Sequence, residues 1–221
     1  FLQKRYNSEK RFKLYGKLAI SFALIFLCIF LYKIFSTGFS AFQKTLIKVD
    51  VTYNSELLFL DENPSLDDIK NADYYDLALE TMANLDLNAD EDQQNELKRM
   101  VSYIFDTEIK NHLLKNPDLL GKTSSVLLTA SDDLDQIFKG NYPRDIPEDL
   151  RRVSDYQLTV YDKLIKDEKI ISKFNFSFFT RADSREAELA GIASAIVGSF
   201  FTILVCLFIS FPVAVLAAIY L

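Results

Sequence analysis

The chain has 221 residues, of which 49% are hydrophobic and 25% are charged, and its formal net charge at pH 7 is -6. This composition excludes a disordered acidic tail, because disordered segments are poor in apolar residues. The apolar residues are also too unevenly distributed for a simple soluble globule. Residues 18–32 and 189–221 contain no charged side chain, and a long polar block separates these two stretches.

Both apolar stretches are suited to crossing a membrane. A helix needs about 20 apolar residues to span the hydrocarbon core of a bilayer, so residues 189–221 are long enough and residues 18–32 are short. Apolar neighbours lengthen the first stretch, and the stems of its flanking lysines can run along lipid to the headgroups. We therefore predict transmembrane helices over residues 14–35 and 189–221, with a basic tail at 1–13 and an intervening domain at 36–188.

A cleaved export signal is the alternative interpretation of the first stretch, since a basic start before a short apolar run is typical of such signals. No small-x-small cleavage site follows the run, because Tyr32–Phe35 is bulky. A retained anchor is the favoured interpretation. The chain begins at Phe1 and stops within an apolar run at Leu221, so we expect it to be a fragment of a longer protein.

Charge placement predicts the orientation of the chain. Residues 1–17 carry a net charge of +5, whereas residues 34–188 carry -12. Basic residues that flank a first membrane helix stay in the cytoplasm, so the acidic block is expected on the far side. Cys28 and Cys206 both lie in the apolar stretches, so no disulfide framework is expected in the outer domain.

Three segments of the outer domain are predicted to be strands. Residues 47–53 alternate apolar and polar side chains, and Phe174, Phe176 and Phe178 alternate with polar residues near the other end of the domain. This two-residue period is typical of half-buried strands. Because both segments lie close to a predicted membrane helix, we expect them to pair or to be neighbours at the base of the domain. Residues 123–129 predict a short buried strand.

Between these strands the hydrophobic period becomes helical. Ser65 is a candidate N-cap for a helix that runs to about Ala83, and Asp90 or Asn88 can cap a second helix. The chain breaks at Asn116-Pro117. The second helix is expected to turn one face inward, with Leu97, Met100, Val101, Ile104, Phe105 and Ile109.

A last long helix is predicted to begin at Pro147. The residues expected to face the core from it are Leu150, Val153, Val160, Tyr161, Leu164 and Ile165. The predicted fold is therefore an α-helical membrane protein with two transmembrane helices and, between them, a helix-dominated α+β extracytoplasmic domain.

No motif in the chain predicts a catalytic, cofactor-binding or metal site. Gly121-Lys122-Thr123 ends like a phosphate-binding loop but lacks the earlier glycine that such a loop needs. The acidic run 86–92 lacks the glycine of a calcium loop, and a solvated helix start is favoured. The acidic cluster 132–135 is expected to form the first turn of a short helix, and His112 to occupy an ordinary helix position. The chain is therefore not expected to be an enzyme.

Charged residues crowd into the segment just before the second apolar stretch. They predict either a rigid, ion-paired collar beside the membrane or a plain interface anchor, and the second reading is the simpler one. The collar candidates are Arg181, Asp183, Arg185, Glu186 and Glu188.

The second apolar stretch contains residues that a passive anchor does not need. Small side chains allow close contact between helices, and a proline inside a helix frees a backbone carbonyl in the membrane. Helices of this kind are usual in multi-helix transporters. The candidate hinge and packing residues are Pro212, Gly191, Gly198 and Ser199.

Several runs of residues together resemble one known family. Phe174–Phe179, Asp183–Glu186 and Glu188–Ile192 resemble the end of the outer domain in one branch of the PstA permeases, which are membrane subunits of the bacterial phosphate-import ABC transporter. The continuation from Gly198 to Leu221, with Phe211-Pro212, resembles the start of that family's core permease domain. Residues 11–53 are similar to the amino-terminal region of the same branch.

The resemblance implies a permease half with several partners. These are a second permease subunit, PstC, two ATPase subunits, PstB, and a periplasmic phosphate-binding protein, PstS, with phosphate as the transported substrate. ATP and Mg would be bound by the ATPase, so no cofactor is expected in this chain. The implied location is the bacterial inner membrane, with the amino terminus in the cytoplasm and residues 36–188 in the periplasm. Membrane lipid is an expected contact, and nucleic acid is not.

A two-helix receptor, such as the input module of a histidine kinase, is the alternative function, because it has the same topology. Composition alone slightly favours it, and a structural membrane anchor is a third possibility. Pro212, the small residues around Gly198 and the family resemblance favour the permease. The charge of the outer domain agrees, since a net -12 repels phosphate and leaves its capture to a partner.

Overall fold

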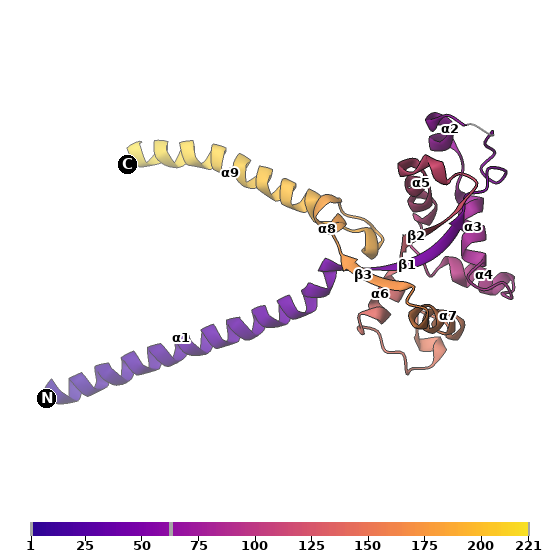
Figure 1. Cartoon of the computed structure of the whole chain (residues 1–221). Helices are drawn as coiled ribbons and strands as arrows, with labels where there is room; N and C mark the ends of the chain where they lie inside the picture. The colour runs from indigo at the N-terminus through magenta and orange to yellow at the C-terminus, as the bar shows by residue number, and fades with distance from the viewer. Residues whose placement is uncertain (1, 62–63, 221) are drawn as a thin grey trace. The chain divides into compact units, whose positions relative to one another are not determined.

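The computed structural model describes residues 2–61 and 64–220 (Figure 1). The chain divides into two compact units, Phe1–Phe42 and Gln43–Leu221. The first unit is helical. The second contains a mixed domain and a further long helix.

The first unit consists of α1, Leu2–Gly38, and a short 3-10 helix, η1, Phe39–Phe42. The segment Glu9–Phe42 reaches a mean hydropathy of 2.5 and is long and apolar enough to cross a membrane. The predicted transmembrane segment, residues 14–35, lies wholly within α1. The helix extends beyond it on both sides because no proline interrupts the flanks and an ion pair of 2.6 Å joins Lys13 to Glu9 one turn away.

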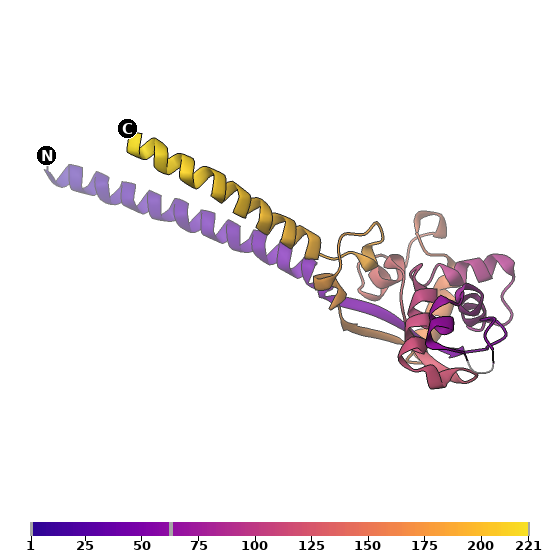
Figure 2. The same ribbon diagram turned by 90° about the horizontal axis from the view of Figure 1, so that it is seen from above.

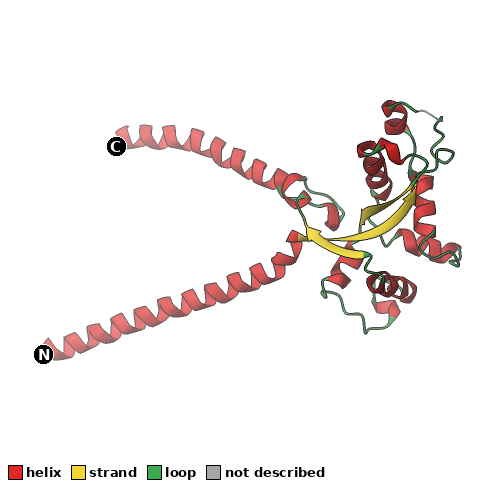
Figure 3. Ribbon diagram, in the orientation of Figure 1, coloured by secondary structure: helices red, strands yellow, loops and turns green. Residues whose placement is uncertain are grey.

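The second unit is built on a three-stranded antiparallel sheet with the strand order β2-β1-β3 (Figure 3). Its strands are β1, Gln43–Thr52, β2, Thr123–Thr129, and β3, Ile170–Phe174. β1 pairs with both neighbours, β2 along its second half and β3 along its first half. The predicted strands at 47–53 and 123–129 are confirmed, and so is the expected pairing of the first strand with the last.

The strand expected around Phe174, Phe176 and Phe178 is only partly correct. β3 ends at Phe174, which lies opposite Gln43 at the start of β1. Asn175 then turns the chain, because its Oδ1 accepts hydrogen bonds from Ser177 Oγ at 2.6 Å and from the Phe178 amide at 3.3 Å. Phe178 therefore belongs to a single helical turn, α8, Ser177–Thr180.

Along the chain, the described residues between β1 and β2 form four α-helices and a short 3-10 turn, η2, Pro117–Leu119, and the α-helices gather at the end of the sheet farthest from α8 (Figures 1 and 2). The helix predicted from Ser65 to Ala83 is two helices. Ser65 caps the first through a capping box, as expected, but Asp73 Oδ1 accepts a hydrogen bond from the Tyr75 amide at 2.9 Å and starts the second. The four helices are α2, Leu66–Asn71, α3, Tyr75–Ala83, α4, Glu91–Lys98, and α5, Phe105–Lys115.

The second predicted helix is also divided, into α4 and α5. Asp90 caps it as expected, through a capping box with Gln93. After α4 the backbone leaves the helix because Val101 forms a β-bridge with Ala130, and the Ser102 amide donates to Thr129 O at 2.8 Å. The inward face was nevertheless predicted well, since only Ile104 of the six residues is not fully buried.

Two helices lie between β2 and β3: α6, Asp132–Phe138, and α7, Asp155–Lys166, with the short turn η3, Glu148–Leu150, between them. The acidic cluster forms the first turn of α6, as predicted. The predicted start of the last helix at Pro147 is wrong, because Ser154 forms the capping box that begins α7. Leu150 and Ile165 are exposed rather than inward, at 70% and 43%.

The last long helix is α9, Ala193–Tyr220, with a mean hydropathy of 2.7 and Pro212 inside it. By length and composition it too can cross a membrane. The predicted span began at Leu189, four residues before the helix. The boundary differs because Leu189 lies in a short turn, η4, Ala187–Leu189, and is buried against the domain.

A single apolar core joins the sheet to the surrounding helices. Its centre is the inward face of β1, where Ile47, Val49 and Val51 are almost fully buried. This follows from the two-residue period of the strand, which directs every second side chain to the same face. Among the described residues, the buried residues of this core fall between Ile47 and Leu164, so none of them belongs to α1 or α9.

Candidate functional site

The candidate site is the junction segment, residues 175–192, which connects β3 to α9, together with the polar side chains packed beside it. Three backbone hydrogen bonds fold this segment back on itself. The amides of Gly191, Ile192 and Ala193 donate to the carbonyls of Ala182, Phe178 and Arg181, at 2.9, 2.8 and 3.1 Å. These bonds hold the start of α9 against residues 178–182, so the helix does not follow an extended linker.

Gly191 is essential to this fold-back. A Cβ placed on it would lie 2.3 Å from the carbonyl oxygen of Arg181 and 2.7 Å from the carbonyl carbon. Backbone atoms can move away from such a contact only at a high cost in free energy, so only glycine fits. Gly191 was predicted to offer a packing surface within the second apolar helix, but it precedes α9 and serves the junction instead.

Leu189 and Glu188 anchor the junction segment on the domain. The turn that carries them packs against α6. Leu189 is buried, and Glu188 Oε2 is buried without a hydrogen-bond partner among the described residues. The same holds for Ser102 Oγ, on a residue that is only 1% exposed. The two side chains are neighbours, since the Ser102 hydroxyl partly offsets the raised pKa of Glu188, but neither atom makes a hydrogen bond of ordinary geometry.

Burial raises the pKa of Glu188 above the ordinary range of a glutamate. Two nearby carboxylates, Asp132 and Glu186, raise it further, whereas the hydroxyl of Ser102 acts in the opposite direction. The junction therefore contains a carboxyl group that binds a proton more tightly than a surface glutamate does.

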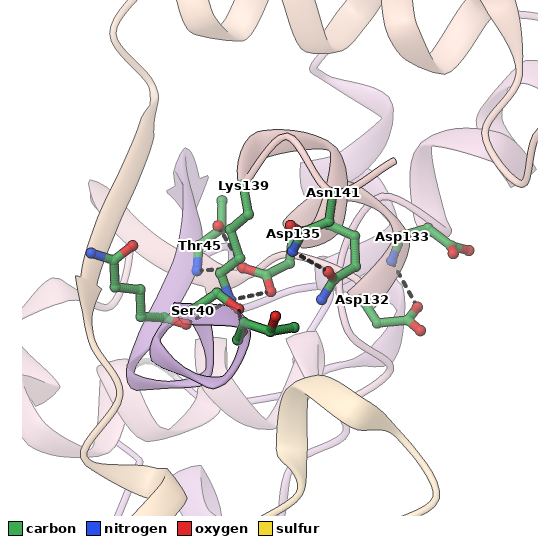
Figure 4. Close-up of polar contacts among 10 residues, drawn as sticks. Ser40, Thr45, Asp132, Asp133, Asp135, Lys139 and Asn141 are labelled. Carbon is green, nitrogen blue, oxygen red and sulfur yellow. Dashed lines mark hydrogen bonds and ion pairs between the residues drawn. The ribbon is translucent and has the colours of Figure 1, made fainter. Parts of the chain in front are cut away.

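A second carboxylate, Asp135, joins α6 to the start of β1 (Figure 4). Its Oδ1 accepts hydrogen bonds from the amide and the hydroxyl of Thr45, at 3.1 and 2.6 Å. Its Oδ2 accepts from Lys139 Nζ at 2.6 Å, and this lysine also donates to Gln43 O at 2.8 Å. Asp135 is only 8% exposed, so this is a nearly buried ion pair with all of its strong contacts made.

Glu108 of α5 holds the end of β2 in the same region. Its Oε2 accepts a hydrogen bond from the Thr129 amide at 2.7 Å, and its Oε1 accepts from the Thr129 hydroxyl. Lys44 Nζ lies 3.9 Å from Glu108 Oε1. Burial lowers the pKa of Lys44, Arg181 lowers it further, and the carboxylates of Glu108, Glu188 and Asp135 oppose the change.

These contacts bring together three basic and three acidic side chains from β1, α5, the region of α6 and the junction segment. The arrangement balances charge and ties strands to helices. Among the described residues, no group of three or more His, Cys, Asp or Glu side chains is placed to hold a metal ion. The six residues are Lys44, Glu108, Asp135, Lys139, Arg181 and Glu188.

Of the two interpretations of the charged segment, the ion-paired collar has no ion pair to support it among the described residues. Arg181, Asp183, Arg185 and Glu186 are exposed, and within the part of the chain that the structure describes no ion pair joins them. Only Glu188 turns inward.

Pro212, Gly198 and Ser199 all lie in α9, as expected. Proline has no amide hydrogen, so the Phe208 carbonyl one turn earlier loses its usual helical partner. A Cβ at Gly198 would meet nothing within 4 Å among the described residues. Gly198 O also accepts a hydrogen bond from Thr202 Oγ1 at 2.8 Å.

Sequence reasoning missed most of the polar side chains beside the junction. Lys44, Glu108, Lys139 and Ser102 were not singled out, and Asp135 was treated only as part of an acidic helix start. The spacing of Asp135 and Lys139, four residues apart on one helix, was the single available signal. Glu108 has no such signal, because its partner Thr129 is on another element.

Gly121-Lys122 and His112, to which the sequence assigned no functional site, make structural contacts. Gly121 has a positive φ of 75° and, with Lys122, connects by backbone hydrogen bonds to Tyr53 next to β1. His112 lies in α5, as expected, and its Nδ1 is 2.8 Å from the Tyr53 hydroxyl. Both contacts connect Tyr53, just after the end of β1, to other parts of the domain.

Comparison with known proteins identifies one family. A family described as "Domain of unknown function (DUF3333)" matches residues 1–148, which is about two thirds of the chain. No curated protein matches the sequence. No solved structure matches it either.

Proposed function

This chain belongs to the DUF3333 family, and we propose that it is the amino-terminal part of a permease subunit of an ABC-type importer for inorganic phosphate. In this proposal α1 and α9 cross the bacterial inner membrane, with the amino terminus in the cytoplasm and the domain between them in the periplasm. The positive charge of residues 1–17 supports this orientation.

The observation that carries the proposal is the composition of α9. Its apolar surface is exposed along the helix, and it contains both Pro212 and the small pair Gly198-Ser199. A helix that only anchors a domain needs no internal proline and no small-residue surface. Helices that pack against several others in a transporter use both.

Other subunits would supply the remaining functions. The second permease subunit, PstC, would complete the path for phosphate, and the PstB ATPases would bind ATP and Mg. The phosphate-binding protein, PstS, would deliver the substrate, because the acidic domain of this chain repels phosphate. The domain itself would be a docking or stabilising insertion that is joined firmly to α9 at the junction.

Phosphate uptake by cells tests this proposal directly. A strain deleted for the complete gene, and also lacking low-affinity phosphate carriers, is compared with the same strain carrying the gene in phosphate-starved medium. We expect deletion to abolish high-affinity, arsenate-sensitive uptake and the gene to restore it. Unaltered uptake in the deletion strain would refute the permease function.

Pro212 provides a more specific test within the full-length protein. We expect Pro212→Ala to reduce the rate of phosphate uptake several-fold while assembly with the partner subunits is retained, because the alanine restores the hydrogen bond to the Phe208 carbonyl and stiffens the helix. The matched control is Val213→Ala, which changes the next residue without changing the backbone. Equal uptake by the two variants would show that Pro212 is not a hinge.

A sensor module is the second candidate, and the junction favours it. Three backbone hydrogen bonds connect the fold-back segment to the start of α9, so a movement in the domain would reach that helix directly. The two functions differ in what a complete gene would encode. A permease has further apolar spans after residue 221, whereas a receptor continues into an amphipathic signalling helix.

A further inference from the structure

The domain contains a cavity that the proposed transport function does not use. It lies between α6, α7 and the connection that joins them, residues 139–154, and has a volume of about 370 Å³. Most of its wall is apolar, and this volume is within the range of small-molecule sites. The cavity explains why Leu150 is exposed, since its side chain lines this opening instead of the core. Other apolar residues of the wall are Ile137, Tyr142, Ile146, Val153 and Leu158.

Three arginines line the same cavity, and each has an aspartate partner. Arg144 Nη2 lies 2.6 Å from an oxygen of Asp162, and Arg152 Nη1 lies 3.5 Å from an oxygen of Asp133. Arg151 pairs with an aspartate one turn along the chain, Asp155. A guanidinium has five N–H donors, and each of these pairs uses one oxygen of its aspartate. The arginines therefore retain capacity to bind a further anionic group.

Arg151 differs from the other two in being buried. Its side chain is only 7% exposed, compared with 40% for Arg144 and 67% for Arg152. Its Nε is buried and has no hydrogen-bond partner among the described residues. A buried charged donor without an acceptor is costly, and few remain in folded proteins.

We propose that this cavity binds a small organic carboxylate with an apolar body. The carboxylate pairs with the guanidinium of Arg151, and the apolar body lies against the side chains of α6 and α7. The three arginine–aspartate pairs are each neutral, and Asp145 and Glu148 line the adjoining opening beside Arg144 and Arg151, so the surroundings are acidic overall. A single negative charge with a large apolar part therefore fits this site better than a fully hydrated multivalent anion such as phosphate.

Binding of 4-phenylbutyrate to the full chain in lipid nanodiscs tests the proposal. Isothermal titration is carried out with empty nanodiscs as the blank, which removes partitioning into lipid. We expect saturable binding at one site per chain. The neutral analogue 4-phenylbutan-1-ol should bind at least about tenfold more weakly, since it lacks the charge that the arginine recognises, and inorganic phosphate should not compete.

Two variants assign the binding to this cavity. Arg151→Gln removes the buried guanidinium and should weaken 4-phenylbutyrate binding about tenfold or more, whereas the control Arg185→Gln, on the exposed junction segment, should bind as the unchanged chain does. Leu150→Asp places a negative charge at an exposed position of the wall and should weaken binding to a similar extent. It provides an independent test if the Arg151 variant does not fold.

Three results would overturn the proposal. They are the absence of saturable binding above the blank, equal affinity for the acid and the alcohol, and full affinity in a folded Arg151→Gln or Leu150→Asp variant. None of these results bears on phosphate uptake, so the cavity proposal and the permease function are tested independently.

Discussion

At the scale of single residues, Glu188 is a carboxylate whose ionised form is unfavourable in the folded junction. The Oε2 atom of Glu188 is buried without a hydrogen-bond partner among the described residues, and burial raises the pKa of the side chain. A raised carboxyl pKa means that the folded state prefers the protonated form. The stability associated with this preference is present below the ordinary glutamate pKa and is lost as the pH rises through the folded value.

Replacing Glu188 should therefore stabilise the domain at neutral pH. We expect Glu188→Gln to raise the free energy of unfolding by about 1 kcal/mol at pH 7, a modest gain because the side chain is only half-buried, and to change little at pH 4. Thermal unfolding at both pH values measures the difference. Glu186→Gln, exposed on the same segment, is the control, and lower stability of the Glu188 variant at pH 7 would contradict this reading.

Gly191 and Gly198 form a matched pair for a second test. Gly191→Ala should destabilise the junction by about 1–3 kcal/mol, because its Cβ would overlap the Arg181 carbonyl. Gly198→Ala meets open space and should be neutral or slightly stabilising. Limited proteolysis across residues 175–192, combined with thermal unfolding, distinguishes them. Similar cleavage rates in the two variants would show that the fold-back does not depend on the close contact.

At the scale of secondary-structure elements, the domain depends on polar contacts between helices and strand ends. Asp135 connects α6 to β1, and Glu108 connects α5 to β2. Both contacts join elements that are distant in sequence. Apolar packing orients the helices on the sheet, and these carboxylates fix where each helix meets its strand.

Removing the Asp135 side chain should be far more damaging than removing a surface aspartate. Asp135→Ala leaves Lys139 and Thr45 buried without their partner, so we expect a loss of about 3–5 kcal/mol in the free energy of unfolding. Asp50→Ala removes an exposed pair with Lys169 and an exposed hydrogen bond from Ser125, and should cost about 1 kcal/mol. Denaturant unfolding followed by far-UV circular dichroism compares the two. Comparable losses would mean that Asp135 is not a structural link.

At the scale of the whole molecule, the domain and the two long helices are distinct kinds of structure. The domain has its own apolar core, whereas both long helices expose apolar side chains along their length. Such exposure is tolerated when lipid or other helices cover the surface. This is the pattern expected of a membrane protein with an external domain.

Single-cysteine labelling tests the orientation. In a variant with Cys28→Ser and Cys206→Ser, Asp92→Cys in the domain should react with a membrane-impermeant maleimide added to spheroplasts, while Arg11→Cys should react only after the membrane is permeabilised. The basic tail determines this difference. Labelling of position 11 from outside would reverse the orientation, and equal labelling of both positions in sealed spheroplasts would exclude a single spanning arrangement.

The sequence by itself determined those features that depend on local patterns. The period of residues 47–53 and 123–129 predicted two strands, Ser65 and Asp90 predicted helix caps, and uncharged runs predicted two long apolar helices. Each of these depends on residues that are neighbours along the chain. Even the pairing of the first and last strands followed from their common closeness to the apolar stretches.

Only the tertiary structure decided where the elements break and which polar groups meet. The second predicted helix divides because Val101 pairs with Ala130, and Leu189 leaves the apolar helix because it packs on the domain. The partners of Glu108 and the contact between Gly191 and Arg181 likewise join separate elements. Local periodicity carries no information about such contacts, because their energy arises only when folding brings distant segments together.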